Sequence, residues 1–306
     1  MTSTAVVIPT FNRRSALLSG LSTLFEALPA RHQVIVIDSG STDGTLDSVK
    51  TQFPQAYLIE GDSSWWWAAA TNAGIRKARD LGCSSVLTYN DDNVATPTLL
   101  ANLTLAMESA PNSIIAAVCC YRDRPELIFF AGRMRAERSD RFYYLDHDAP
   151  LSALGKGQRR VDMLHGMCTL FPMAVFDAVG LFNEQAFPQV FADDDLLMRA
   201  SRAGFPLQVA LEAVVLNDRS KTGINPYDRR LGPLGIVHLL VSRKSTFQFA
   251  ARTRFLWRYR RSFFFFCKTW IFDYCRLFTV LLARWLLPFK VFHWLGILWG
   301  QRLQRK

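Results

Sequence analysis

The first hundred residues alternate between short apolar runs and longer segments in which apolar residues recur every three or four positions. Short β-branched runs bounded by turn residues predict buried strands, and the longer spacing predicts helices that pack through one face. The predicted strands cover residues 5–8, 33–37, 56–60 and 84–89, and the predicted helices cover 13–28, 45–52 and 68–81. This alternation implies a parallel sheet with right-handed crossovers, in which ligands bind at the carboxyl ends of the strands.

Polar side chains follow three of these strands at the point where each strand ends. Thr10 and Asn12 follow the first strand, Asp38 ends the second, and residues 90–93 (Asn-Asp-Asp-Asn) follow the fourth. Parallel strands share one carboxyl edge, so these side chains are expected to converge there. Adjacent carboxylates at such a rim favour Mg²⁺ or Mn²⁺ holding a diphosphate. Residues 90–93 with the following 96–98 also resemble an ordinary helix cap, so a polar turn is the alternative.

The pattern continues into a second half with its own acidic cluster. Residues 114–120, 127–131 and 161–171 predict further strands, and 98–109 predict a helix. Asp193, Asp194 and Asp195 open another predicted helix, where an N-terminal cap is one explanation. Three adjacent carboxylates repel one another and exceed what capping needs, so a functional role is favoured.

Residues 132–160 are polar and rich in turn formers. A long charged connection beside a binding edge is often a mobile lid or an acceptor-side loop. A solvated insertion without a role explains the same composition, and the sequence does not decide between the two.

Trp65, Trp66 and Trp67 form a run of three indoles. They cannot all face one way, so at least one is expected near the surface or a pocket, where aromatic faces stack on bases and sugars. Trp66 or Trp67 lining a donor pocket is the functional hypothesis, and core packing of two of the three is the alternative. His165, in an apolar run, either contacts a diphosphate or an acceptor or has a structural role.

Charge is distributed unevenly along the 306 residues. Residues 241–306 contain fourteen Lys or Arg and one acid, Asp273, which gives them a charge of +13 against +10 for the chain, so residues 1–240 sum to −3. This basic excess predicts that the tail meets an anionic surface. The six cysteines lack metal-ligand spacing and indicate reduced thiols of a cytosolic protein, and the N-terminus lacks a charged leader, which argues against export.

On a helical wheel the charged residues from Lys268 to Arg302, including Lys290, fall within one half, and Trp, Phe and Leu cover most of the rest. No uncharged stretch reaches the about 18–20 residues that a bilayer-spanning helix needs. The tail therefore predicts helices lying in the membrane interface, and hence a peripheral protein at the cytoplasmic face of the inner (plasma) membrane. Nucleic acid is the alternative partner of basic and aromatic residues, but it leaves the continuous apolar face unexplained.

Four motifs, residues 7–13, 36–45, 71–74 and 90–92, together resemble the nucleotide-sugar-binding half of glycosyltransferase family 2, with its rhamnosyltransferase-like members. The resemblance covers about the first 100 residues. It implies the GT-A fold, an α/β fold with a mostly parallel sheet flanked by helices, and a nucleoside-diphosphate-sugar donor bound with Mn²⁺ or Mg²⁺. With Trp66 added from its aromatic character, the expected donor-binding residues are Pro9, Thr10, Asn12, Asp38, Asp43, Trp66, Asn72, Asn90 and Asp91.

Within this resemblance, Asp38 is expected at the nucleobase and Asp92 at the metal, while Asp91 binds ribose or metal. Asn90 stands where the family usually has the first acid of its metal motif, which lowers the expected metal affinity. Further on, where a metal-binding His is frequent in the family, this chain has Asn217 and Asp218. Asp218 is expected to substitute as a metal ligand, and Arg219 or Lys221 alternatively neutralises the diphosphate.

Residues 161–171, 180–184 and 191–199 are similar to the acceptor half of the same family. The family's catalytic acid falls on Asp193, and Ala192 occupies the position of the usual Glu. Inverting transfer needs a base that deprotonates the acceptor hydroxyl, and Asp193 is the expected base.

The sequence thus predicts a GT-A domain over residues 1–240, with a donor half at 1–100 and an acceptor half at 101–240, and a C-terminal amphipathic helical appendage at 241–306. The expected function is inverting transfer of a sugar to a lipid-linked or cell-surface polysaccharide acceptor, as in lipopolysaccharide or polysaccharide biosynthesis. An inactive nucleotide-sugar-binding or scaffold protein is the alternative, because Asn90 and Ala192 depart from the family pattern.

Overall fold

The computed structural model describes residues 3–28, 32–136, 141–218, 231–288 and 291. By its internal contacts the chain divides into two compact units. The first, called the sheet unit here, comprises residues 1–134 and 144–221, and the second, the helical unit, comprises residues 135–143 and 222–306.

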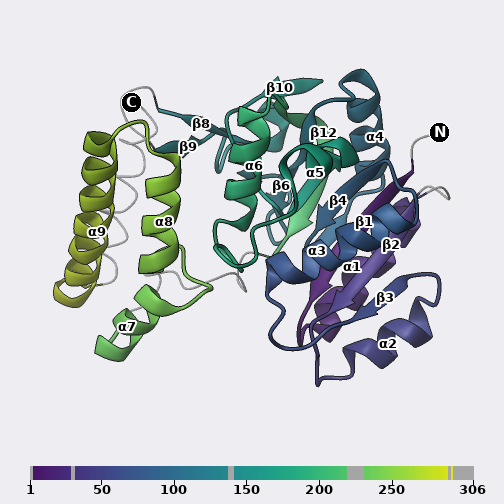
Figure 1. Ribbon diagram of the computed structural model, residues 1–306, viewed down its shortest axis with the longest axis horizontal. Helices are drawn as coiled ribbons and strands as arrows, with labels where there is room; N and C mark the ends of the chain where they lie inside the picture. The colour runs from purple at the N-terminus through teal and green to yellow at the C-terminus, as the bar shows by residue number, and fades with distance from the viewer. Residues whose placement is uncertain (1–2, 29–31, 137–140, 219–230, 289–290, 292–306) are drawn as a thin grey trace. The chain divides into compact units, whose positions relative to one another are not determined.

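A ten-stranded mixed sheet forms the centre of the sheet unit (Figure 1). Its order is β10-β12-β6-β11-β4-β1-β2-β3, with β5 beside β12 and β7 beside β6. Strand β1 pairs in parallel with β2 and β4, while β11 pairs antiparallel with β4 and β6. The strands are β1 (Thr4–Thr10), β2 (Gln33–Asp38), β3 (Tyr57–Glu60), β4 (Ser85–Tyr89), β5 (Asn93–Ala95), β6 (Ile114–Tyr121), β7 (Ile128–Phe130), β10 (Gln158–Arg160), β11 (Cys168–Pro172) and β12 (Leu207–Asn217). The expected α/β fold with a mostly parallel sheet flanked by helices is confirmed.

Helices cover both faces of this sheet, because its central strands are apolar on both sides. Val6 and Ile8 of β1 belong to the core cluster that includes the apolar residues of α1 and α4, whereas Val7 lies on the opposite face against α3. Helix α3 lies close to the sheet at Gly74, where an added Cβ would lie 2.4 Å from Val7 Cγ1. The helical segments are α1 (Arg14–Ala27), α2 (Thr45–Gln52), α3 (Trp67–Asp80), α4 (Leu99–Ser109), the 3₁₀ turn η1 (Leu151–Ala153), α5 (Met173–Val179) and α6 (Ala192–Arg202).

The strand predicted over residues 161–171 is shorter in the structure, where β11 begins at Cys168. Cys168 pairs with Tyr89, the last residue of β4, so Met167 lies past the end of β4. There the Asn90 amide donates to the Met167 carbonyl (3.0 Å). Met167 therefore borders the loop that follows β4, while residues 161–163 bond Leu207 of β12 and Arg133.

The polar stretch 132–160 contains regular structure. Strand β10 extends the main sheet by antiparallel pairing with β12, and β8 (Arg133–Arg135) pairs with β9 (Phe142–Tyr144) in a separate two-stranded sheet. Residues 158–160 are thus an edge strand of the main sheet and not part of a loop.

Three helices form the described part of the helical unit: α7 (Pro233–Val241), α8 (Phe249–Tyr259) and α9 (Phe263–Leu286). Leu239 of α7 packs with Tyr274, Leu277 and Leu281 of α9 in a small core. Because of this packing α7 belongs with the other two helices, so the helical unit begins before the boundary predicted at residue 240.

Helix α9 buries two of its charged residues and exposes several of its apolar ones. Asp273 and Arg284 are buried, although the helical wheel grouped them with the charged face expected to be polar and accessible. Arg252 Nη2 lies 2.5 Å from Asp273 Oδ2, and Arg141 Nη2 lies 3.6 Å from Asp273 Oδ1, so the acid is neutralised inside the unit. Lys290 and Arg302 lie outside the described residues.

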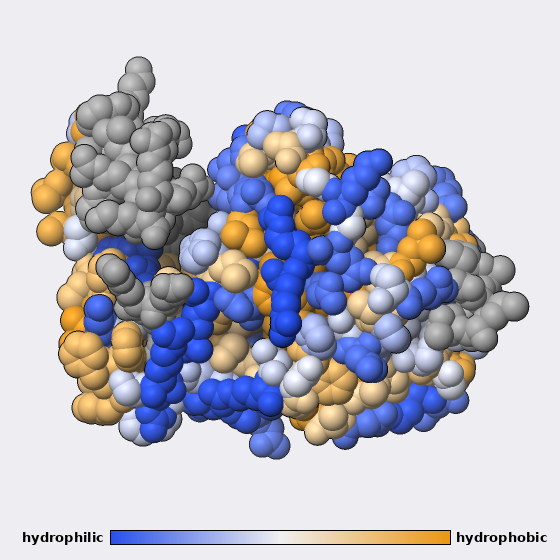
Figure 2. Space-filling model, turned by 90° about the horizontal axis from the view of Figure 1, so that it is seen from above, coloured by the Kyte–Doolittle hydropathy of each residue, from blue (hydrophilic) through white to orange (hydrophobic). Residues whose placement is uncertain are grey.

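The outer face of α9 is strongly apolar, and apolar side chains gather over the helical unit in Figure 2. We call this set the α9 face; its residues are Ile271, Phe272, Phe278, Leu282, Trp285 and Leu286, each between 47% and 72% exposed. Among the described residues, none of the helices combines the length and the apolar character needed to cross a bilayer.

Candidate functional site

The ends of β1, β2 and β4 converge as their parallel arrangement predicts. Thr10 lies opposite Asp38 in the register of β1 with β2. The Thr10 hydroxyl also donates to Asp91 Oδ2 (2.9 Å) in the loop after β4. The structure thus brings Thr10, Asp38, Asp91 and the adjoining Asp92 to one edge of the sheet.

Hydrogen bonds join the loops that follow β1 and β2. Asn12 has a left-handed backbone (φ 52°), which Asn tolerates better than most residues, and its Oδ1 accepts from the Thr42 amide (2.8 Å). The Asn12 amide donates to Ser41 Oγ (2.8 Å), whose hydroxyl donates to Asp38 Oδ1 (2.5 Å). The two loops therefore form one connected surface beside the buried Asp38 carboxylate.

Asp43 and Pro9, two further predicted donor-binding residues, have contacts within the fold. Asp43 accepts from the Thr45 hydroxyl and from the amides of Thr45 and Arg14, and the Thr45 hydroxyl bond is the main reason that its pKa is lowered. Pro9 is buried within β1, opposite Ile37. Both residues have structural contacts, and their expected contact with a donor stays a prediction.

A buried pair of carboxylates forms the centre of the edge. Asp91 and Asp92 are 7% and 3% exposed, and the Arg13 guanidinium bridges them, with Nη1 2.9 Å from Asp91 Oδ1 and Nη2 3.0 Å from Asp92 Oδ2. Burial raises the pKa of Asp91 to about 6, while Arg13 opposes that rise. A positive group is therefore seated between these two acids.

Asn217, at the end of β12, completes the surroundings of Asp92. Its Nδ2 donates to Asp92 Oδ1 (2.8 Å) and to Asn93 Oδ1 (2.9 Å), while Asn93 Nδ2 donates to the Met167 carbonyl (2.7 Å). The sequence analysis predicted the neighbouring Asp218, and not Asn217, as an oxygen ligand of the metal. The sequence did contain a signal for Asn217. Successive residues of a strand face opposite sides of the sheet, so Asn217 and Asp218 are expected to point to opposite sides.

In the parts of the chain that the structure describes, no three His, Cys, Asp or Glu side chains gather as a metal-binding group would. The acidic pair is therefore not joined by Asp218 into such a group, and the ligand role of Asp218 stays a prediction. Arg219 and Lys221 lie outside the described residues, and Asn90 contacts the acceptor half through its backbone.

Asp193, Gly166 and Trp67 form a second cluster at the start of α6. Asp193 Oδ2 accepts from the Gly166 amide (2.8 Å). A Cβ added to Gly166 would lie 3.0 Å from the Trp67 ring and 3.1 Å from Asp193 Cβ, so the three residues are in contact. The indole of Trp67 thus lies next to the predicted base, which makes it a better candidate for contact with a sugar than Trp66.

The three adjacent acids of α6 have different surroundings. Asp194 pairs with Arg133, and the fully buried Asp195 pairs with Arg199 (2.9 Å), which also donates to the Leu181 carbonyl. Asp193 carries no ion pair within the described part of the chain. Burial raises its pKa to about 6, Asp194 adds to that rise, and Arg133 opposes it.

Several sequence expectations need correction or refinement. All three tryptophans are partly buried; Trp66 is the N-cap residue of α3, and Trp67 packs edge-to-face on the buried Phe182 (5.0 Å). Asn72 is 2% exposed and holds the chain at Phe182 and Glu184 through three hydrogen bonds. Its side-chain amide therefore has a structural role, and its expected contact with a donor stays a prediction.

His165 also has a structural setting. Its Nδ1 accepts from the Met167 amide (2.9 Å), and its ring packs edge-to-face on Phe130 (4.3 Å). Burial lowers the pKa of His165 to about 3, so the imidazole is neutral at physiological pH.

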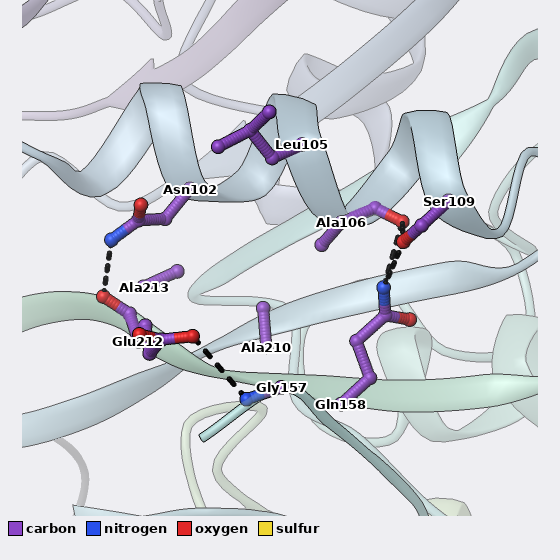
Figure 3. A pocket seen from close by; sticks show the side chains of 9 residues that line it. All are labelled: Asn102, Leu105, Ala106, Ser109, Gly157, Gln158, Ala210, Glu212 and Ala213. Atoms are coloured by element: carbon purple, nitrogen blue, oxygen red, sulfur yellow. Dashed lines mark hydrogen bonds between the residues drawn. The ribbon is translucent and has the colours of Figure 1, made fainter.

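A separate hollow lies between α4 and the strands β10 and β12 (Figure 3). Its polar groups bond one another: Asn102 donates to the Glu212 carbonyl (2.6 Å), and Gln158 donates to the Ala106 carbonyl (2.9 Å). None of the sequence-predicted site residues lines it, so we do not assign it to the candidate site.

Several solved structures have folds similar to that of this chain. GalNAc-T7 with UDP, GalNAc and Mn²⁺ gives a TM-score of 0.56 at 12% identity, covering 71% of this chain and 44% of that one. The mannosyltransferase PcManGT from Pyrobaculum calidifontis, with GDP-Man and Mn²⁺, gives 0.52 at 19% identity, covering 72% and 58%. S. aureus TarS 1–349 with UDP-GlcNAc gives 0.53 at 15% identity, covering 78% and 67%. The fold of the sheet unit is thus the GT-A glycosyltransferase fold.

The sequence comparison defines the family. Residues 5–178 match the family described as glycosyl transferase family 2, so this chain belongs to glycosyltransferase family 2. A validoxylamine A glucosyltransferase from Streptomyces hygroscopicus subsp. limoneus is 27% identical over an alignment of 230 residues that covers 68% of this chain and 50% of that protein. A second, from S. hygroscopicus subsp. jinggangensis (strain 5008), is also 27% identical over 230 residues, so the chain spans about half the length of these relatives.

Proposed function

We propose that this protein is an inverting glycosyltransferase that moves a sugar from a nucleoside diphosphate to a lipid-linked or saccharide acceptor. The observation that carries the proposal is the presence of two acidic sites in the sheet unit, the bridged pair Asp91 and Asp92 and the cluster around Asp193. A transferase needs both sites. The negative charge that develops on the leaving diphosphate must be stabilised, and the attacking hydroxyl must lose its proton to a base.

Asp193 is the proposed base. Its pKa of about 6 leaves the carboxylate mostly ionised at neutral pH while keeping it basic enough to accept a proton. The acceptor hydroxyl gives its proton to Asp193 while the hydroxyl oxygen forms a bond to the anomeric carbon of the donor sugar. The bond from that carbon to the diphosphate oxygen breaks, and the electron pair leaves with the diphosphate.

The residues of the acidic pair suit a divalent cation. Mg²⁺ and Mn²⁺ are commonly held through one or two carboxylates plus substrate phosphates, and Arg13 shows that a cationic group is accepted between Asp91 and Asp92. When bound, such a cation would stabilise the negative charge of the leaving diphosphate. Asp38 and the joined loops around Asn12 and Ser41 are proposed to hold the nucleoside.

We further propose that the helical unit attaches the enzyme peripherally to an anionic membrane surface. Residues 241–306 carry a charge of +13, and the α9 face is apolar and outward-facing. Apolar burial in the interface together with Lys and Arg attraction to anionic lipid is the usual basis of such binding. A lipid-linked acceptor would be presented at that surface, on the cytoplasmic face of the inner membrane.

The proposed transfer is tested with purified protein, Mn²⁺ and a panel of nucleotide-sugars screened by thermal shift, followed by donor hydrolysis or transfer with the stabilising donor. We expect one donor class to raise the melting temperature and to be turned over. Asp193→Ala should keep the thermal shift and lose turnover. A shift without turnover in the unmodified protein would instead support a nucleotide-sugar-binding scaffold.

A further inference from the structure

We propose that Arg13 is an internal counter-cation of the acidic pair, which an incoming divalent metal ion displaces and which then becomes available to the donor diphosphate. This inference rests on the proposed use of a nucleotide-sugar and a metal ion. It adds a role for a residue that the sequence reasoning did not select.

The first argument is the fit between the guanidinium and the two carboxylates. Each terminal nitrogen of the Arg13 guanidinium donates a hydrogen bond to one acid, Nη1 to Asp91 Oδ1 (2.9 Å) and Nη2 to Asp92 Oδ2 (3.0 Å). Two adjacent carboxylates that are 7% and 3% exposed are unfavourable without a compensating positive charge. Arg13 supplies that charge in the protein without ligand.

The second argument is that Arg13 and a metal ion compete for the same atoms. Asp91 Oδ2 accepts from Thr10 and Asp92 Oδ1 accepts from Asn217, so Arg13 occupies the remaining oxygen of each acid. A divalent ion placed at those two oxygens would meet a positive charge within a few ångströms, where repulsion is strong. Metal binding therefore requires the guanidinium to leave.

The third argument is that only the side chain of Arg13 needs to move. The backbone before it is fixed, because Asn12 is bonded to Ser41 and Thr42, and the Arg13 carbonyl accepts from Leu17 in the first turn of α1. The Arg13 side chain is 30% exposed, so it has a path to solvent. Guanidinium groups bind phosphate oxygens in bidentate fashion, so the diphosphate of a donor is a suitable new partner.

The main experiment measures Mn²⁺ affinity by electron paramagnetic resonance, without nucleotide, for the full-length protein, Arg13→Gln and Arg14→Gln. Arg14 is the matched control: it is the exposed neighbour, and its guanidinium contacts the Asp43 carbonyl and not the acidic pair. We expect Arg13→Gln to bind Mn²⁺ at least about tenfold more tightly than the unmodified protein, and Arg14→Gln to differ by less than about twofold, because Arg14 acts only through screened, longer-range charge.

The same variants are then titrated with nucleoside diphosphate in saturating Mn²⁺. Arg13→Gln should bind the nucleotide about tenfold more weakly, because a charge-assisted contact to phosphate is lost. Tighter metal binding together with weaker nucleotide binding is a combination that simple loss of structure does not produce.

A second measurement uses the unmodified protein and does not depend on the folding of a variant. Phenylglyoxal reacts with accessible guanidinium groups, and the modified peptides are quantified by mass spectrometry. We expect Mg²⁺ to increase the modification rate of Arg13 several-fold, to leave that of Arg14 unchanged, and a nucleoside diphosphate added with Mg²⁺ to protect Arg13 again.

Three results would overturn the inference: equal Mn²⁺ affinity in Arg13→Gln and Arg14→Gln, loss of Mn²⁺ binding in Arg13→Gln, or an Arg13 modification rate that does not respond to Mg²⁺. If nucleotide still binds in these cases, the proposed function stands and only the role of Arg13 fails. If the unmodified protein binds no nucleotide-sugar with or without metal, the proposed function itself fails.

Discussion

At the scale of the residue, adjacent identical side chains in this protein differ in what they can do. Asp194 and Asp195 are held by Arg133 and Arg199, while Asp193 faces Gly166 and Trp67. Asp194 and Asp195 thus each have a guanidinium partner, whereas burial beside another negative charge makes the Asp193 carboxylate more basic. Of the three acids, Asp193 is therefore the one suited to take a proton.

The pH dependence of transfer should report Asp193. A base must be deprotonated to act, and its pKa is raised to about 6, so kcat/KM should rise with pH and level off above about pH 6. Asp194→Asn removes the neighbouring negative charge, lowers the pKa of Asp193 and should move this acid limb to lower pH. Asp177→Asn, an exposed acid elsewhere, is the control. An acid limb that is identical in all three proteins would exclude Asp193 as the titrating base.

The two acidic sites should fail in different ways. Asp92→Asn is expected to weaken donor binding in Mn²⁺ at least about tenfold, because it removes a charge at the proposed metal site. Asp193→Asn should bind the donor within about threefold of normal and lose about 10²–10⁴ in kcat. Calorimetric titration of the donor and steady-state turnover separate these effects, and an equal loss of donor affinity in both variants would contradict the division of roles.

Individual residues also show where prediction from the sequence stops. The convergence of Thr10, Asp38 and Asp92 followed from strand order alone, because parallel strands end at one edge. The positions of Asn72 and Arg13 did not follow, since a motif gives residue spacing and not the direction of a side chain. Asn72 points into the fold, and Arg13 points back to the acids.

At the scale of the element, helix α1 positions the acidic loop at three successive points. Arg13 precedes its first residue, and Gly20, two turns further on, allows the Asn93 carbonyl to approach: a Cβ on Gly20 would lie 2.6 Å from that oxygen. Thr23 then accepts from the Ala95 amide (3.1 Å). The helix therefore holds residues 91–95 along its length.

Gly20→Ala should disturb this contact. We expect a loss of about 1–3 kcal/mol in the free energy of unfolding, because the added carbon overlaps a backbone atom that has little freedom to move. Gly235→Ala in α7 is the matched control, since its nearest neighbours are side-chain atoms of Leu231, and greater helix propensity should leave it neutral or slightly stabilised. Chemical denaturation measures both. A Gly20→Ala protein as stable as the control would show that the loop yields freely.

The sequence predicted an element well where its own apolar residues define it. It predicted the element poorly where contacts with residues distant in the sequence set its end or its orientation. The runs of β1, β2, β4 and β6 could be predicted from the sequence, because strands buried on both faces of a sheet are short, nearly continuous apolar segments. The end of β11 depends on its partner β4, and the orientation of α9 depends on Arg252 and Arg141, which lie 21 and 132 residues away from Asp273. A helical wheel contains none of that information.

At the scale of the whole molecule, the two units have different surfaces. The helical unit has an outward apolar face on α9, and the basic excess of the sequence falls in residues 241–306. Monomeric soluble proteins rarely expose contiguous apolar surface without a binding role. The proposed membrane attachment therefore predicts that the 306-residue chain binds anionic lipid vesicles.

Full-length protein should bind vesicles containing phosphatidylglycerol, and high salt should release only part of it, because salt screens charge and leaves apolar burial intact. Replacing Phe278 and Leu282 with Ser should weaken vesicle binding at least about tenfold without lowering the melting temperature, since both side chains are more than half exposed. Leu105→Ser, an equally exposed apolar residue of α4, should have no effect on binding.

Flotation of vesicles on a density gradient measures this binding. A lower melting temperature with unchanged vesicle binding would show that the α9 face packs against protein. Binding to nucleic acid with a steep salt dependence, without binding to vesicles, would favour the alternative partner.

The helical unit is built from two separate stretches, residues 135–143 and 222–306, so the backbone passes between the units three times. Arg141 of the short stretch stacks on Phe272 (4.4 Å) and faces Asp273 of the long one. A single cleavage after residue 221 therefore leaves part of the helical unit attached to the other fragment. Fragments 1–221 and 222–306, expressed together, should consequently reassemble and co-purify as a split protein, and Arg141→Gln should weaken their association.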